Sequence, residues 1–162
     1  MIGLEKIHGR DSEDGRQYLT FDLGGQEYGV GILTVQEIRG WSAVTAIPHS
    51  PKWLLGVINL RGVVVPIVDL RIRFNLDRVD FNESTVVIIL NLVDRVVGVV
   101  VDAVSDVITL NSAQIKPAPA LGSKSDTSHI IGFGMLDERM RILLDVDRLI
   151  AGSDLAAAKS VQ

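Results

Sequence analysis

The sequence carries one pattern twice, and this repeat restricts the possible folds more than any other feature. Residues 27–30 align with residues 96–99 at an offset of 69, and an insertion of seven residues later raises the offset to 76. The matches include acidic, proline and glycine residues: Glu37 with Asp106, Pro48 with Pro117, Gly56 with Gly132, and Asp69 with Asp145. Both copies predict the same order of short strands and turns, so we interpret the repeat as a structural duplication.

Each copy holds five short predicted strands in about 65 residues, the size of a small closed barrel without exposed strand edges. The type of apolar residue supports strands, because the chain has 21 Val and 16 Ile against 18 Leu and 10 Ala. β-branched side chains lose rotamer freedom in helices and pack well on pleated sheets. A barrel of this size is marginally stable alone, so we expect the two copies to share an apolar interface that creates a groove.

The two predicted units occupy residues 17–82 and 83–151, and the second unit ends in a short closing helix. Residues 1–16 are polar and carry five charges in their second half, so we expect a flexible N-terminal segment. Residues 152–162 are predicted to be a flexible tail.

Composition and missing motifs exclude several classes of function. The chain has 162 residues, a formal charge of −4 and no Cys. This charge argues against nucleic-acid binding, and the lack of Cys removes thiolate metal sites and a thiol nucleophile. No phosphate-binding loop, nucleophile elbow or zinc-protease motif is present. We therefore expect no catalysis, no cofactor and no metal.

Hydrophobic runs and the N-terminus predict a cytoplasmic protein. The longest apolar stretches, such as Val86–Leu90, are far shorter than the roughly 20 residues that a spanning helix needs. Residues 1–6 lack the apolar core of a signal peptide. We expect no direct insertion into a membrane.

Three segments resemble the CheW-type chemotaxis coupling proteins: residues 27–38, 56–70 and 96–107. The most specific is the second, in which Asn59-Leu60-Arg61-Gly62 precedes an apolar run and Pro66-Ile67-Val68-Asp69-Leu70. The resemblance extends over residues 17–151.

This resemblance implies an all-β fold of two packed SH3-like five-stranded β-barrels with a short C-terminal helix. It also implies a non-catalytic adaptor that couples transmembrane chemoreceptors to the histidine kinase CheA. The expected partners are the cytoplasmic hairpin tip of a methyl-accepting chemoreceptor and the regulatory domain of CheA. The expected location is the cytoplasm, with recruitment to membrane receptor arrays.

Arg61 interrupts the most apolar part of the first unit. From the residues alone it is either a docking residue or an exposed hairpin tip, and the resemblance implies that its position faces the receptor. The planar guanidinium can hold a carboxylate or backbone carbonyls. The resemblance places Glu37 nearby, and we hypothesise that a Glu37–Arg61 pair orients the guanidinium. The alternative for Glu37 is an exposed strand residue.

Five further positions match the family. Val35, Gly98, Val104 and Val107 correspond to positions near the receptor groove, although each is also compatible with barrel core. Gly98 lacks a Cβ, so we expect it to let a receptor helix approach closely. Leu121 lies in the inserted loop, where some family members carry an aromatic residue against the kinase regulatory domain. The resemblance implies rings in which the coupling protein alternates with this regulatory domain, and we expect Leu121 to make a smaller apolar contact in them than an aromatic residue would.

Two other functions remain open from the residues. An SH3-like peptide or small-ligand module outside chemotaxis would need a concave aromatic platform, and the chain has only eight aromatic residues. A metal-dependent enzyme would use some of four aspartates, which are Asp102, Asp106, Asp145 and Asp147. We favour the interpretation that Asp145 and Asp147 cap the last helix.

Overall fold

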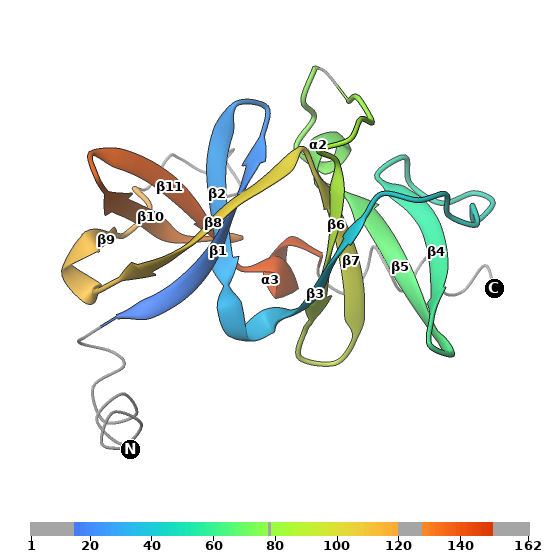
Figure 1. Cartoon of the computed structure of the whole chain (residues 1–162), viewed down its shortest axis with the longest axis horizontal. Coiled ribbons are helices and arrows are strands. Elements are labelled where there is room, and N and C mark those ends of the chain that lie inside the picture. Colours follow the sequence, from blue (N-terminus) through green and yellow to red (C-terminus); the bar gives the residue numbers. More distant parts are fainter. Residues whose placement is uncertain (1–14, 78, 120–127, 151–162) are drawn as a thin grey trace.

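A computed structural model describes residues 15–77, 79–119 and 128–150. Strands dominate the fold and form two sheets (Figure 1). Sheet A has the order β8-β1-β2-β11-β10-β9, and sheet B has the order β3-β6-β7-β5-β4. The predicted all-β class is confirmed.

The strands are β1 (Arg16–Leu23), β2 (Gln26–Gly31), β3 (Val35–Gly40), β4 (Leu54–Leu60), β5 (Val63–Asp69), β6 (Val86–Asn91), β7 (Val96–Val101), β8 (Ala103–Leu110), β9 (Ile115–Lys116), β10 (Ile130–Leu136) and β11 (Arg139–Leu144). The short helices are η1 (Ile32–Thr34), α2 (Leu70–Arg73), η2 (Ser112–Gln114) and α3 (Val146–Leu149).

The duplication extends to the pairing of individual residues. In sheet B, β5 runs parallel to β7 with Ile67 opposite Gly98. In sheet A, β11 runs parallel to β2 with Leu143 opposite Gly29, which are the equivalent positions of the repeat. The predicted offsets are therefore confirmed for these strands.

Bulges recur as well, because the register skips Gln36 in β3 and its equivalent Ser105 in β8. One match of the repeat is wrong. Thr45 forms a bridge with Val57 of β4, and Lys116 of β9 pairs with Phe133, the equivalent residue of β10. Thr45 and Lys116 therefore correspond to each other, at an offset of 71. That offset matches Pro48 with Pro119 instead of Pro117, because the insertion begins before the prolines.

Each sheet takes strands from both halves of the chain. β1 and β2 join β8 to β11 in sheet A, while β3 to β5 join β6 and β7 in sheet B. The predicted boundary between residues 82 and 83 therefore does not separate the sheets. The chain changes sheet at two equivalent points, through η1 after β2 and at Asp102 after β7. In a linear pattern such a crossover looks the same as a turn.

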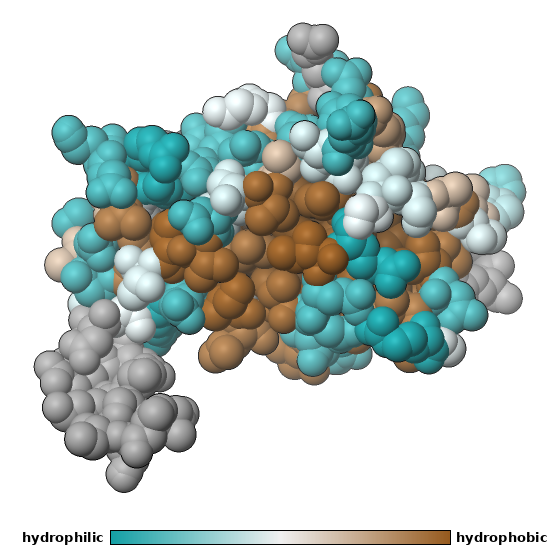
Figure 2. All heavy atoms as spheres, in the orientation of Figure 1, coloured by the Kyte–Doolittle hydropathy of each residue, from teal (hydrophilic) through white to brown (hydrophobic). Residues whose placement is uncertain are grey.

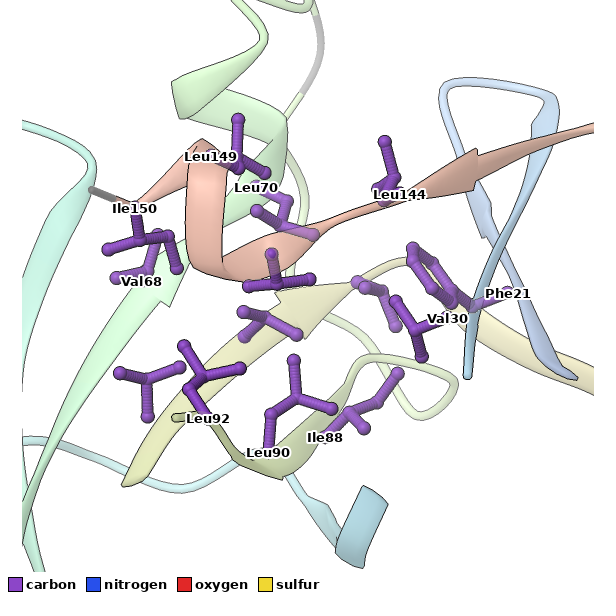
Figure 3. Close-up of a cluster of buried hydrophobic side chains, with 14 of the residues drawn as sticks. Phe21, Val30, Val68, Leu70, Ile88, Leu90, Leu92, Leu144, Leu149 and Ile150 are labelled. Atoms are coloured by element: carbon purple, nitrogen blue, oxygen red, sulfur yellow. The ribbon is translucent and has the colours of Figure 1, made fainter. Parts of the chain in front are cut away.

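The largest buried cluster lies between the two sheets (Figure 3). Phe21 and Val30 enter it from sheet A, Ile88 and Leu90 from sheet B, and Leu149 from α3. Burial contributes about 1.5–3 kcal/mol for each large apolar side chain, so this cluster joins the sheets into one cooperative structure. The predicted apolar interface is present, but it lies between the two sheets and not between the two sequence halves.

Alternation along the strands separates this shared cluster from a core inside each sheet. In β6, Val87 and Ile89 face a second cluster within sheet B, whereas the alternate residues Ile88 and Leu90 face sheet A. Tyr18, Ile108 and Leu143 form the corresponding cluster within sheet A. Both faces of β6 are therefore apolar, which explains the continuous hydrophobic run from residue 86 to residue 90.

The helices α2 and α3 each begin at an aspartate, and these two aspartates occupy equivalent positions in the repeat. The Asp69 side chain accepts a hydrogen bond from Arg71 N at 2.9 Å, and Asp145 accepts one from Arg148 N at 3.3 Å. The predicted closing helix is present as α3, and it lies between the sheets in Figure 1. The capping role predicted for Asp145 is confirmed. No helix within the described ranges is long and apolar enough to cross a membrane.

Candidate functional site

The hypothesised pair between Glu37 and Arg61 is present. Glu37 lies in β3 at the edge of sheet B, and Arg61 lies in the turn between β4 and β5. The Arg61 guanidinium donates from Nη2 to Glu37 Oε1. Arg39 Nη1 lies 3.5 Å from Glu37 Oε2 on the other side. The hydrogen bond from Arg61, together with the charges of Arg61 and Arg39, holds the pKa of the Glu37 carboxyl below its ordinary value.

The turn that carries Arg61 is strained at the arginine. Arg61 and Gly62 have φ angles of 52° and 89°, as a two-residue hairpin turn of type I′ requires. The Asn59 Oδ1 atom accepts a hydrogen bond from Gly62 N at 2.8 Å and closes the turn. A left-handed backbone costs about 1 kcal/mol for a residue with a Cβ. Strain of this kind at a residue with an aimed side chain points to a functional role for that side chain.

Most of the Arg61 side chain remains open to a partner. It is 65% exposed although it contacts Glu37. A guanidinium has five N–H donors, so donors remain for a carboxylate or a carbonyl on another molecule. The pair therefore presents an oriented cation at the edge of sheet B.

The apolar cluster between the sheets reaches the surface at two edge strands. Ile38 of β3 lies opposite Ile88, and Val107 of β8 lies opposite Leu19. Both opposite residues belong to the cluster between the sheets. Directly opposed side chains lie on the same side of a sheet, so Ile38 and Val107 both face that cluster. They are nevertheless 45% and 43% exposed.

Two predicted residues extend this apolar surface. Val35 and Val104 occupy equivalent positions in β3 and β8, and both pack half-buried against the same cluster. We name the surface formed by Val35, Ile38, Val104 and Val107 the β3–β8 face. Figure 2 shows apolar side chains gathered in the middle of this view, over the region where Figure 1 places β3 and β8.

Gly98 is not available to a partner, so the expected close approach of a receptor helix at this residue is wrong. Gly98 is buried, and a Cβ there would lie 2.6 Å from Ile67 Cδ1 and 2.9 Å from Val87 Cγ1. Both neighbours belong to the core of sheet B. The missing side chain makes room for that core. Leu121, the predicted kinase contact, lies outside the described residues.

The four aspartates considered for metal chemistry are held separately by other groups. Asp102 Oδ2 accepts from Gly24 N at 2.8 Å, and Asp106 Oδ1 accepts from Val107 N at 2.7 Å. Asp147 Oδ1 accepts from Val93 N at 3.2 Å, and Asp145 caps α3. Within the described part of the chain, no three His, Cys, Asp or Glu residues are grouped to hold a metal ion.

Sequence reasoning missed a buried arginine. Arg71 and Asp69 are fully buried, and the Nε and Nη2 atoms of Arg71 each lie 3.0 Å from an Asp69 carboxylate oxygen. Arg71 Nη1 also donates to Asp102 Oδ1 at 3.1 Å, and the Phe81 ring covers the guanidinium. Burial alone would lower the pKa of Arg71, but the two aspartates outweigh it and raise that pKa.

This buried network joins the sheets. Asp102 lies where the chain crosses from sheet B to sheet A, and it also binds the turn between β1 and β2 through Gly24. An arginine two residues after a strand-ending aspartate is the available signal in the sequence. That signal is weak, because arginine is rarely buried unless it is paired.

A groove of about 860 Å³ lies beside α3, on the sheet A side of the molecule. Its walls come from the sheet A strands β1, β2, β8, β10 and β11, from η1 and from the start of α3, and Leu92 after β6 closes it. The six predicted docking residues within the described ranges do not line it, so it is separate from the β3–β8 face.

A family model of the CheW-like domain matches residues 17–154. The chain belongs to the CheW-like domain family. The resemblance drawn from three sequence segments is confirmed, and the match covers the eleven strands of the described residues apart from Arg16 at the start of β1.

Individual CheW relatives agree with this assignment. The chain is 49% identical over 162 residues to the chemotaxis protein CheW of Klebsiella aerogenes, covering 99% of this chain and 98% of that protein. It is 39% identical over 113 residues to the CheW of Bacillus subtilis, covering 70% and 72%. The crystal structure of the scaffolding protein TtCheW from Thermoanaerobacter tengcongensis matches with a TM-score of 0.79 and 29% identity, covering 86% of this chain and 95% of that one.

Proposed function

We propose that this chain is a non-catalytic adaptor that couples transmembrane chemoreceptors to the histidine kinase CheA in bacterial chemotaxis. Identity of 49% along the whole chain with a chemotaxis protein CheW supports the process, and the solved relative described as a scaffolding protein supports the adaptor role. The proposed location is the cytoplasm, with recruitment to receptor arrays.

The β3–β8 face carries the proposal for the receptor. It combines an apolar middle with charged residues at its border, which is the usual anatomy of a protein interface. A helical hairpin can place its apolar side against such a surface. We assign receptor contacts to Val35, Val104 and Val107, with Glu37 holding Arg61 toward a carboxylate or carbonyl of the receptor.

Our proposal for the contact with the regulatory domain of CheA is less detailed than that for the receptor. Leu121 stays a predicted kinase contact, carried by the resemblance. Gly98 contributes to docking only through the core that supports β6 and β7, because its surroundings are buried.

The alternative of a peptide-binding module has less support. Tyr28 and Phe74 stack with their centroids 5.6 Å apart, but both pack against the cluster between the sheets. Another close pair among the described rings is Trp41 and Phe81, whose centroids lie 4.5 Å apart. Phe81 covers the buried guanidinium of Arg71 at 4.7 Å. This pair protects an internal ion pair, and it does not line the groove beside α3.

A capture experiment with purified CheA and receptor-containing membranes tests the proposal. Arg61→Ala should stay folded and lose coupling, because the oriented cation is removed from the interface. A loss of at least about tenfold in receptor affinity is expected for a charged hydrogen bond at an interface. Arg139→Ala is the matched control, since Arg139 is also 65% exposed and follows the equivalent turn.

The control variant should retain coupling. A folded Arg61→Ala protein that still recruits CheA to receptors and activates it would overturn the site assignment. Failure of the unchanged protein to bind either partner would overturn the adaptor function.

A further inference from the structure

The β3–β8 face is nearly symmetric in shape. The repeat relates Val35 to Val104 and Ile38 to Val107, and the last two are exposed to almost the same extent. A partner that matched only this apolar pattern could bind in two orientations related by a half turn. Something else must distinguish the orientations if the partner binds in one of them.

The charges beside the face are not symmetric. The sheet B side carries the Glu37 carboxylate between two guanidiniums, Arg39 and Arg61. At the equivalent positions of sheet A, Asp106 replaces Glu37, Asp137 replaces Arg61 and the buried Ile108 replaces Arg39.

The turns that carry these charges match in backbone and differ in chemistry. Arg61 and Asp137 have φ angles of 52° and 53°. Glu138 stands where the other turn has Gly62, and it adds a further carboxylate. Arg139 does not cancel these charges, because its Nη1 atom lies 3.5 Å from Glu27 Oε1. One side of the face is therefore cationic and the other is anionic.

We propose that this difference in charge fixes the orientation of the docked partner. The partner is an antiparallel two-helix hairpin with one acidic arm, which lies against Arg39 and Arg61. The other arm carries basic groups and lies against Asp106, Asp137 and Glu138. In the reversed orientation like charges meet on both sides, and such contacts reject the wrong arrangement. The inference rests on the proposed receptor docking and adds the orientation in which the hairpin lies on the β3–β8 face.

Cross-linking can measure this orientation directly. Because the chain has no Cys, Ile38→Cys and Val107→Cys each create a unique thiol on one side of the face. The probe is a soluble two-helix fragment of a chemoreceptor cytoplasmic tip, with a single Cys on either its first or its second arm. A bismaleimide joins the nearest thiols by addition, without an oxidant.

In the otherwise unchanged protein, the two positions should cross-link to opposite arms, each with a preference of about tenfold or more. The preference should weaken at high salt, because exposed charges are screened beyond about 3 Å at 1 M. Equal cross-linking to both arms at low salt would overturn the inference.

Grafting one turn onto the other removes most of the asymmetry while Arg61 stays in place. The variant Asp137→Arg with Glu138→Gly copies the Arg61-Gly62 turn, and the matching φ angles make the fold compatible with the change. Its preference should fall to about twofold, since the new guanidinium offsets the Asp106 carboxylate and the sheet A side is then no longer anionic. The control Asp137→Glu with Glu138→Asp keeps both charges and should keep the preference.

A strict preference in the grafted variant would overturn the inference. A folded, unchanged protein that gives no cross-link from either position would contradict the receptor docking itself, and the inference with it. The two failures are thus distinguishable in one experiment.

Discussion

Glu37 is a carboxylate held between two guanidiniums at the edge of a sheet. We predict that an NMR titration gives its side chain a pKa below the ordinary glutamate value, because the Arg61 hydrogen bond stabilises the charged form. Arg61→Ala should raise that pKa, and Arg39 should keep part of the effect. An unchanged pKa in the variant would show that the pair does not persist in solution.

The same shift sets a dependence of stability on pH. A carboxyl whose pKa is lower in the folded state adds stability above its unfolded pKa and loses it as the pH falls through the folded pKa. The difference in unfolding free energy between the unchanged protein and Glu37→Gln should therefore be largest near neutral pH. It should vanish in acid, and a constant difference would contradict the assignment.

Gly98 acts on the core and not on a partner. Gly98→Ala should lower the free energy of unfolding by about 1–3 kcal/mol, because the new Cβ collides with Ile67 and Val87. Combining it with Ile67→Val, which removes the closest atom, should cost less than the sum of the two single changes. Urea unfolding of the four proteins gives this coupling, and strict additivity would show that the collision is absent.

At the scale of elements, α2 and α3 are equivalent helices with equivalent aspartate caps, but only α2 contains the buried Arg71. Asparagine caps a helix as well as aspartate does. Asp145→Asn should therefore cost less than about 1 kcal/mol. Asp69→Asn should cost about 3 kcal/mol, because it leaves a buried guanidinium without its main counter-ion. Equal costs in thermal or urea unfolding would contradict the role of the network.

The strands themselves could be predicted, because short Val- and Ile-rich runs between turn residues are typical of strands. The pairing of the strands into sheets could not be predicted. A crossover between sheets and a turn within one sheet both appear as a short break in the apolar pattern, so the exchange of strands stayed hidden. The buried position of Arg71 could not be predicted for a similar reason, since its two partners, the carboxylates of Asp69 and Asp102, are brought together only by the fold.

The β3–β8 face was predicted in part. Glu37 and Arg61 came from the family resemblance, and their contact is present. Ile38 was missed as a candidate, although the repeat relates it to Val107. A residue that matches a candidate in the other copy is the signal that would have found it. Gly98 was misplaced because a strand pattern does not say which face of a sheet meets a partner.

At the scale of the whole molecule, the exchange of strands ties the two halves together. Residues 1–82 contain β1 to β5, and residues 83–162 contain β6 to β11. Neither half holds a complete sheet, and the largest cluster needs residues from both. We predict that each half alone lacks a cooperative thermal transition by circular dichroism. The two halves mixed together should recover one. A cooperative transition in a single half would contradict the exchanged topology.

The central claim is that the β3–β8 face is where a chemoreceptor docks. Methyl NMR with a soluble receptor hairpin fragment tests it most directly, because other exposed apolar residues serve as internal controls. The account predicts the largest shifts for Val35, Ile38, Val104 and Val107. It predicts small shifts for four exposed residues elsewhere, which are Leu33, Val93, Ile131 and Met140. Shifts centred on these four, with the β3–β8 face unperturbed, would contradict it.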